Sequence, residues 1–144
     1  MHKLLKFTFV AFFVLVSISS CKKTTSAPDY PELIGSWSGS TSQSQVISLY
    51  VDNIEGTLYL TSLGFTIFFD TGGQQSLKLY NSEGLTSVNN RYFKYLLGTG
   101  IYGQSYVDGT FNTSSMTVTG TFKCYNPSNP NDYTSGTFVA SKAK

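Results

Sequence analysis

The chain has 144 residues, with one histidine and two cysteines, and its formal net charge is +2 at pH 7. That length is typical of a single domain. Lys3 and Lys6 account for the whole positive excess, because the remaining residues carry as many acidic as basic side chains. A chain without a basic stripe lacks the electrostatic basis for binding nucleic acid, so we expect no nucleic-acid partner.

The first twenty residues predict an export signal. Lys3 and Lys6 precede an uncharged and mostly apolar run over residues 7–18. This run is shorter than the roughly 20 residues that a membrane helix needs, and it matches the core of a signal peptide. We expect residues 1–20 to be removed, and with them His2, the only histidine. Without an imidazole, the mature chain has neither a Ser-His-Asp triad nor a Cys-His pair.

The segment Ile18-Ser19-Ser20-Cys21 resembles the lipobox of bacterial lipoproteins. In that motif an aliphatic residue, most commonly Leu, stands three positions before the cysteine, and small residues stand directly before it. The resemblance implies cleavage between Ser20 and Cys21, followed by acylation of Cys21 on its sulfur and its new amino group. Several acyl chains on one residue form a stable membrane anchor, since each buried CH₂ contributes ~0.8 kcal/mol.

The alternative for the two cysteines is a Cys21–Cys124 disulfide, which an exported chain could form. If Cys21 is acylated, Cys124 has no cysteine partner. It falls on the same alternate positions as Met116, Val118 and Phe122. We therefore expect Cys124 to be a small buried apolar side chain, because a catalytic thiolate needs a nearby cation or histidine.

Residues 21–32 predict a lipidated cysteine followed by a flexible tether. The stretch "KKTTSAPDYPE" contains two prolines and no hydrophobic periodicity. Lys22 and Lys23 would lie beside lipid headgroups and add a weak attraction to anionic lipid. The lipoprotein resemblance implies anchoring to the outer membrane. Because no acidic cluster follows Cys21, the periplasmic face is favoured over exposure at the cell surface.

Residues 33–144 predict one all-β domain. Apolar side chains alternate with polar ones in short runs separated by turn residues such as "DN", "SLG", "DTGG" and "NTSS", and no window shows a helical period. Eight or nine strands joined mostly by tight turns favour an antiparallel up-and-down meander barrel of about eight strands. Some glycines are expected inside strands, where they mark bulges or bends: Gly56, Gly103, Gly109 and Gly120.

The run "LIGSWSG", Leu33 to Gly39, contains Gly35 and Trp37 two positions apart. This spacing resembles the G-x-W opening of lipocalins and their calycin relatives, which include the avidins. The resemblance implies a lipocalin-like barrel in which Trp37 plugs one end under a cationic side chain from late in the chain. Lys142 takes that place here, where the family usually has arginine. The repeated endings "DGTF", "TGTF" and "SGTF" also look like those of small exported lipocalin-like lipoproteins.

The acidic residues do not predict an active site. Asp52, Asp70 and Glu83 fall in or beside expected turns, and Glu55 and Asp108 fall on the polar side of strands. A glycosidase needs two carboxyl groups that face each other.

The segment with Asn129, Asn131 and Asp132 offers oxygen ligands but lacks the acidic density of a calcium loop. We therefore expect no enzyme activity, no metal site and no cofactor.

Tyrosines are a second possible source of binding chemistry. Several fall on the polar phase of strands or in expected loops: Tyr92, Tyr102, Tyr106, Tyr125 and Tyr133. Exposed tyrosines stack on sugars or form a face for a partner. Ordinary cross-strand pairing of aromatic side chains is the simpler interpretation, and we favour it at this point.

The leading functional hypothesis is a lipid-anchored, extracytoplasmic binding module. Its barrel would hold a small apolar or amphipathic ligand, or would offer two mouth loops, Asn81–Arg91 and Tyr125–Tyr133, to an outer-membrane partner. The alternative is a non-enzymatic structural or accessory lipoprotein with a filled barrel and no ligand. No particular ligand-binding residues are predicted.

Overall fold

The structure is a computed structural model that describes residues 27–69, 73–79, 85–100, 103–126 and 129–144. The predicted export signal, Ser20, Cys21 and the first part of the tether lie outside these residues, as does most of the predicted "DTGG" turn. No helix among the described residues is long and apolar enough to cross a membrane.

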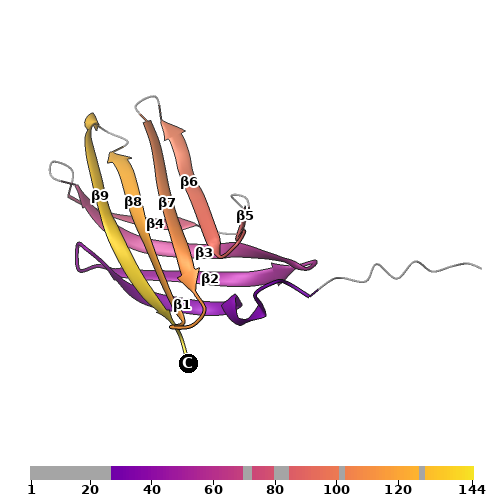
Figure 1. The fold of residues 1–144 in the computed structure, drawn as a ribbon. Coiled ribbons are helices and arrows are strands. Elements are labelled where there is room, and N and C mark those ends of the chain that lie inside the picture. Colours follow the sequence, from indigo (N-terminus) through magenta and orange to yellow (C-terminus); the bar gives the residue numbers. More distant parts are fainter. Residues whose placement is uncertain (1–26, 70–72, 80–84, 101–102, 127–128) are drawn as a thin grey trace, which may run out of the picture.

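The described residues form one short 3-10 helix followed by nine strands (Figure 1). They are η1 (Pro31–Leu33), β1 (Gly35–Thr41), β2 (Val46–Ile54), β3 (Thr57–Phe69), β4 (Gly73–Leu79), β5 (Thr86–Ser87), β6 (Tyr92–Gly100), β7 (Gly103–Asn112), β8 (Thr117–Asn126) and β9 (Asn129–Lys142). All the strand pairs are antiparallel.

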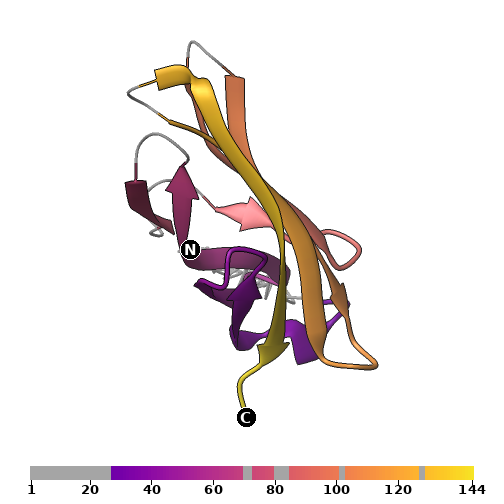
Figure 2. The ribbon, with the colours of Figure 1, turned by 90° about the vertical axis from the view of Figure 1, so that its left-hand side faces the viewer.

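The strands form one sheet in the order β4-β3-β2-β1-β9-β8-β7-β6, with β5 paired to β3 outside this path. Within β1–β4 and within β6–β9, strands adjacent in the sequence lie side by side, and the β1–β9 pairing joins the first strand to the last. This pairing curls the sheet into a nearly closed barrel that is open between β4 and β6, and β6–β9 cross steeply over β1–β4 (Figures 1 and 2). The predicted all-β antiparallel meander barrel is confirmed.

Strand β3 runs without a break through the "SLG" segment, where the sequence predicted a turn. A bulge in the β2–β3 pairing leaves Thr61 without an opposite residue. It shifts the buried positions from Leu60 to Leu63, so the alternation changes phase in the middle of the strand. In the sequence, such a phase change looks the same as a gap between two strands.

Gly56 lies in the β2–β3 turn and not inside a strand, which corrects that prediction. Glu55 and Gly56 have φ angles of 51° and 88°. Two successive positive φ angles are typical of the tight hairpin turns whose twist matches the flanking strands. The Asn53 side-chain oxygen accepts a hydrogen bond from the Gly56 N–H at 2.9 Å and holds the turn closed.

The segment Tyr125–Tyr133 was predicted as a loop, and this prediction is wrong for its described residues. Strand β8 continues to Asn126, β9 begins at Asn129, and Tyr125 pairs with Tyr133. The composition of asparagine, proline and serine suggested a loop. Pro130 lies in the irregular stretch between the last two residue pairs, where the missing proline N–H interrupts no regular pairing.

Gln43, in the β1–β2 turn, connects two strands that extend beyond β1 and β2. Its side-chain amide donates to the Phe68 carbonyl at 3.1 Å and to the Thr134 hydroxyl at 2.8 Å. Its side-chain oxygen accepts from the Phe68 N–H at 3.0 Å. Gln43 therefore bonds to the β3 backbone at Phe68 as a neighbouring strand would, and it holds β3 against β9 at the end of the barrel where the β1–β2 turn lies.

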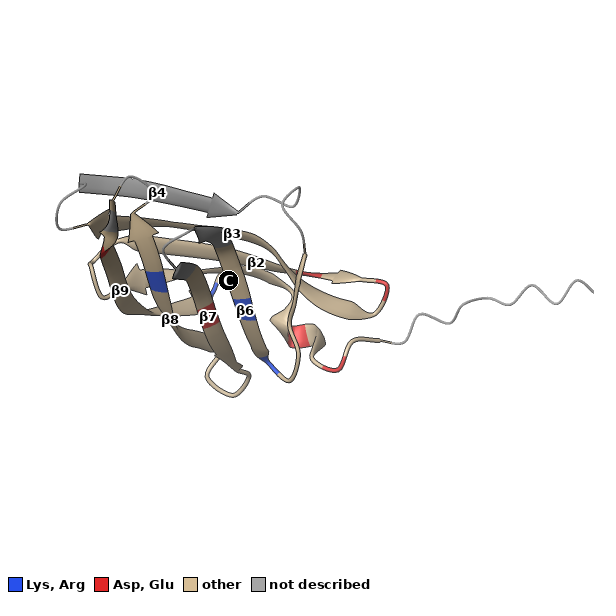
Figure 3. Cartoon of the chain, turned by 90° about the horizontal axis from the view of Figure 1, so that it is seen from above, with Lys and Arg blue, Asp and Glu red and all other residues tan. Residues whose placement is uncertain are grey.

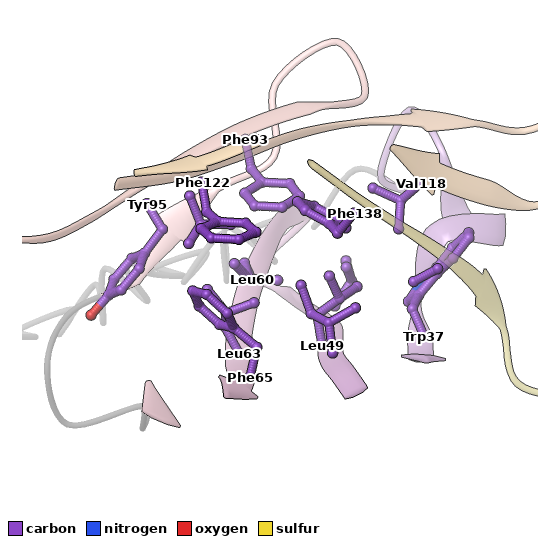
Figure 4. Packing of buried hydrophobic residues seen from close by; sticks show 14 of the residues in the cluster. Trp37, Leu49, Leu60, Leu63, Phe65, Phe93, Tyr95, Val118, Phe122 and Phe138 are labelled. Carbon is purple, nitrogen blue, oxygen red and sulfur yellow. The ribbon is translucent and has the colours of Figure 1, made fainter. Parts of the chain in front are cut away.

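The repeated Gly-Thr-Phe segments build the interior of the β6–β9 wall. In each segment the glycine and the phenylalanine share the inner side of the strand, because side chains two apart point the same way. A Cβ on Gly109 would lie 2.8 Å from the Phe93 ring, and one on Gly136 would lie 2.6 Å from the Phe122 ring. Rings from neighbouring strands thus rest on the glycine backbone, facing apolar side chains of β2 and β3 (Figure 4).

Gly120 gives a direct test of this packing. A Cβ at this position would overlap the Asp108 carbonyl oxygen and the Phe138 ring. We expect Gly120→Ala to lower the free energy of unfolding by about 3 kcal/mol, measured by chemical denaturation of the full chain in mild detergent. Thr119→Val, on the exposed side of the same strand, serves as the control and should change stability by no more than about 0.5 kcal/mol. Equal denaturation midpoints for Gly120→Ala and wild type would contradict the packing.

Candidate functional site

Trp37 fills one end of the barrel, which we call the plug end. Its side chain is fully buried, and its indole N–H donates to the Leu33 carbonyl oxygen at 3.0 Å. The Phe111 ring meets it edge-on, with a distance of 4.9 Å between ring centroids. Pro31 begins the short helix η1, which brings the Leu33 carbonyl within reach of the indole.

The structure brings Gly35 and Lys142 to the same place as Trp37. Lys142 is the cross-strand partner of Trp37, and its ammonium lies 6.0 Å from the indole ring centroid, at the outer limit of a cation–π contact. The ammonium also donates a hydrogen bond to the Glu32 carbonyl oxygen of η1. Gly35 has a φ of +124°, which strongly favours glycine, and the Lys142 stem passes beside it.

Sequence reasoning missed two further contacts at the plug end. The Arg91 guanidinium lies 5.7 Å from the Tyr30 ring centroid, and the Arg91 carbonyl accepts the Phe111 N–H at 2.8 Å. The first contact joins the start of the domain to the turn before β6, and the second joins that turn to β7. Neither Tyr30 nor Arg91 belongs to a recognisable motif, because their proximity depends on how the barrel closes.

Trp37→Phe tests the plug. The substitution removes the indole donor from the buried Leu33 carbonyl and leaves space beside Phe111. Together these losses should reduce the free energy of unfolding by about 2–4 kcal/mol, measured by denaturant titration. Ser38→Ala, an exposed change on the same strand, should leave the midpoint nearly unchanged. Unchanged stability of Trp37→Phe would show that the indole hydrogen bond does not hold this end together.

Cys124 is a buried free thiol on β8, as predicted. Its side chain shares the inner face of the strand with Val118 and Phe122. Burial raises the pKa of the thiol from 9.0 to about 12, because the thiolate would lose its hydration. The thiol is therefore protonated at neutral pH, and a protonated buried thiol is a poor nucleophile.

The raised pKa of Cys124 makes stability depend on pH in a defined range. The folded chain keeps the thiol protonated to about pH 12, whereas the unfolded chain loses the proton near pH 9. The stabilisation is complete below pH 9 and is lost as the pH rises toward 12. We expect the difference in unfolding free energy between wild type and Cys124→Ala to shrink between pH 8 and pH 11. A constant difference over that range would contradict a buried neutral thiol.

The carboxylates of Asp108 and Asp132 make structural hydrogen bonds. Asp108 accepts from the Thr121 hydroxyl at 2.7 Å and from the Tyr92 hydroxyl at 3.4 Å. Desolvation, followed by the charge of Asp108, raises the pKa of Tyr92 above its usual value. Asp132 is buried and accepts from the Asn126 amide at 2.9 Å. Asp70 and Glu83 lie outside the described residues.

Among the residues that the structure describes, no group of three or more His, Cys, Asp or Glu side chains is placed to hold a metal ion. The oxygen-rich segment around Asn129 and Asp132 is part of β9, and its carboxylate lies on the inner side of the barrel.

The two predicted mouth loops do not share a mouth. The described part of the first, residues 85–91, lies at the plug end, where the Val88 N–H donates to the Leu58 carbonyl and the Arg91 carbonyl accepts from Phe111. The second, Tyr125–Tyr133, lies at the opposite end, which we call the far end, and most of it belongs to strands. This separation could have been predicted from the sequence. Each strand carries the chain from one end of an up-and-down barrel to the other, so two loops with three strands between them lie at opposite ends.

Tyrosines and lysines gather on the outer face of β6–β9. We define the tyrosine–lysine strip as Lys94, Tyr106, Lys123, Tyr125 and Tyr133. The Lys94 ammonium lies 4.8 Å from the Tyr106 ring centroid. The Lys123 ammonium lies 4.9 Å and 4.5 Å from the Tyr125 and Tyr133 centroids. The ring centroids of Tyr125 and Tyr133 are 5.7 Å apart. Since Tyr106 and Lys123 are also cross-strand partners, the strip is continuous from β6 to β9.

The strip is accessible and keeps its positive charge. Tyr133 is 52% exposed, while Lys123 and Tyr125 are partly buried. The side chain of Tyr125 is the main cause of a raised pKa for Lys123, so that ammonium is charged at neutral pH. Figure 3 shows the basic positions on β6 and β8 in blue. Of the predicted candidate tyrosines, Tyr102 lies outside the described residues.

A groove of about 390 Å³ lies where the sheet is open, between β5 and β6. Thr86, Ser87, Tyr92 and Lys94 contribute to its lining. Because β6 ends the sheet order on this side, the groove runs along the edge of the β6–β9 wall. Lys94 belongs to both the groove and the tyrosine–lysine strip.

No protein-family model, curated protein or solved structure matches the chain. The resemblances to lipobox lipoproteins and to lipocalins therefore stay predictions made from short motifs.

Proposed function

We propose that the protein is a lipid-anchored, extracytoplasmic and non-enzymatic binding module of the bacterial outer membrane. We further propose that the outer wall of the barrel, and not its interior, contacts the bound molecule. The observation that carries this proposal is the position of the aromatic side chains. Phenylalanine rings occupy the interior, whereas the tyrosines of the strip lie on the outside beside charged lysines.

The packing of the interior favours binding outside. A barrel of about eight strands either fills with side chains or holds one small ligand. Phe93, Phe122 and Phe138 are each at most 2% exposed and rest on the wall glycines. The ring centroid of Phe65, on β3, lies 5.5 Å from that of Phe122. An apolar ligand in this part of the barrel would have to displace these rings, at the cost of their buried contacts.

The chemistry of the described groups supports a non-enzymatic role. Cys124 is buried and protonated at neutral pH. Asp108 and Asp132 accept hydrogen bonds from neighbouring side chains in arrangements that stabilise the β7–β8 and β8–β9 pairs. A general acid or base needs an open path to substrate and a pKa suited to proton transfer.

The position of the tether supports binding away from the membrane. The domain begins at η1, at the plug end, and Thr117 of β8 lies near this end because the Met116 carbonyl accepts the Lys142 N–H. Tyr125 is eight residues farther along β8, which corresponds to roughly 26 Å of strand. The tips of β8 and β9 lie opposite the C-terminus and the helix η1 (Figures 1 and 2). An anchor at Cys21 would therefore leave the strip facing away from the lipid.

A structural or accessory lipoprotein without any ligand is the second candidate function. The packing of the described phenylalanine rings in the interior supports both candidate functions equally. The two candidates differ at the tyrosine–lysine strip, which is a binding surface in the first and a set of stabilising cross-strand contacts in the second.

Substitution of the two cysteines tests the anchor. We expect wild-type protein and Cys124→Ala to fractionate with membranes and to carry an acylated Cys21 in intact-mass and peptide measurements. Cys21→Ala should lose the acyl mass and its stable association with membranes. An unmodified Cys21 in membrane-extracted protein would overturn the lipid anchor.

Native mass spectrometry of the detergent-extracted protein tests the place of binding. We expect no small apolar molecule to remain bound, because the described phenylalanine rings pack against one another and against the wall glycines. A stoichiometric apolar ligand that is lost in a substitution of an interior residue such as Phe122→Ala, but kept in Tyr133→Ala, would contradict binding at the outer wall.

A further inference from the structure

We propose that the tyrosine–lysine strip binds an acidic polysaccharide, a chain of sugar rings that carry carboxylate groups. This inference rests on the proposed binding function and names the chemical class of the ligand. It concerns one surface, the outer face of β6–β9 from the middle of the wall, at Lys94, to the far end of the barrel, at Tyr125 and Tyr133. The groove beside β6 adjoins the strip through Lys94.

The strip is an ordered row rather than a chance collection of side chains. Leu96, Tyr106 and Lys123 are successive cross-strand partners on β6, β7 and β8, and Tyr125 pairs with Tyr133 one step closer to the far end. All of these side chains point outward, because the alternate, inward positions of the four strands are occupied by buried residues: Tyr95, Val107, Cys124 and Phe138. Four neighbouring strands span roughly 14 Å, a length that suits several linked sugar rings and not one.

The charge of the strip is unbalanced in a way that favours an anion. Within the described residues, Lys94 and Lys123 contact tyrosine rings, and no ion pair to a carboxylate is formed by either. Asp108 is the cross-strand partner of Lys94, but its oxygens accept from Thr121 and Tyr92 instead. The two ammonium groups are therefore held in place by ring faces while their charge stays available to a ligand. A carboxylate on the ligand complements each of them.

The tyrosines make a sugar a better match than a lipid or a nucleic acid. A tyrosine offers an apolar ring and a hydroxyl with little loss of side-chain freedom, which suits a ligand with both apolar C–H faces and hydroxyl groups. Exposed hydroxyls of Thr121, Ser135 and Thr137 surround the row and add hydrogen-bonding groups. Lipid headgroups lie at the other end of the domain if Cys21 is the anchor. Nucleic acid needs several phosphate-binding cations, and this face supplies two.

Calorimetric titration with polygalacturonate tests the proposal, using the full-length protein in a neutral detergent. Polygalacturonate carries one carboxylate on each ring, and its methyl ester keeps the rings but removes the charge. We expect the acid form to bind and the ester to bind at least tenfold more weakly. Raising the salt concentration from 50 mM to 300 mM should weaken binding of the acid form, because added ions screen exposed charges.

Four variants locate the site. Lys123→Ala and Tyr133→Ala should each weaken binding of polygalacturonate by tenfold or more. Lys144→Ala, at the C-terminus, and Tyr50→Ala, on the outer side of β2, remove the same residue types from other surfaces and should leave the affinity unchanged. Circular dichroism and the denaturation midpoint check that each variant is folded. For Tyr133, the milder Tyr133→Phe variant keeps the ring and should retain most of the affinity.

Several outcomes would overturn the inference. The strip is not the site if folded Lys123→Ala and Tyr133→Ala bind as wild type does. Equal affinity for the acid and the methyl ester excludes carboxylate recognition, and absence of any binding excludes this ligand class. Equal affinity for a single-stranded DNA of the same charge would show a general polyanion surface instead of a glycan site. None of these results affects the acylation of Cys21, which the mass measurements test separately.

Discussion

The contact between phenylalanine rings and the glycines of adjacent strands determines the shape of this barrel. Gly120 is opposite Gly109 on one side and Phe138 on the other, so two bare backbones and one ring meet at the centre of the wall. Any side chain at these positions would push the rings into the facing layer, where Leu49 and Leu63 already lie. The same Gly-Thr-Phe order that turns the rings inward turns the threonines outward. The repeated segments therefore set both the apolar interior and the polar exterior of β7, β8 and β9.

The inward pattern of the strands could be predicted from the sequence because it depends on local alternation. Val118, Phe122 and Cys124 are buried as their spacing indicated. Gly35, Trp37 and Lys142 lie together at the plug end. They could be predicted because the Gly-x-Trp spacing stands at the start of the first strand and Lys142 at the end of the last one. These features require only that a strand has two faces and that the first and last strands meet.

Other features could not be predicted because they depend on register. A bulge at Thr61 changes the phase of β3 without any turn residue to mark it. The strand character of Asn129–Tyr133 is decided by pairing with β8, which outweighs a local composition typical of loops. The tyrosine–lysine strip was visible only as separate tyrosines, since the pairing of Tyr125 with Tyr133 depends on that same hairpin. The surface that carries the proposed binding chemistry could therefore not be predicted, because it depends on how the strands pair.

The pairing of β1 with β9 has a consequence for how the chain reaches this structure. The partners Trp37 and Lys142 are separated by about 100 residues of sequence, whereas the other strand pairs join near neighbours. Hairpins such as β7–β8 can form as soon as their residues are available. The first strand can pair with β2 early, but its other edge has no partner until the last residues of the chain arrive. The entropy of closing that long loop opposes this step. Closure of the barrel is therefore expected to be the late, rate-limiting event in folding, and until then β1 remains an exposed edge that another chain could pair with.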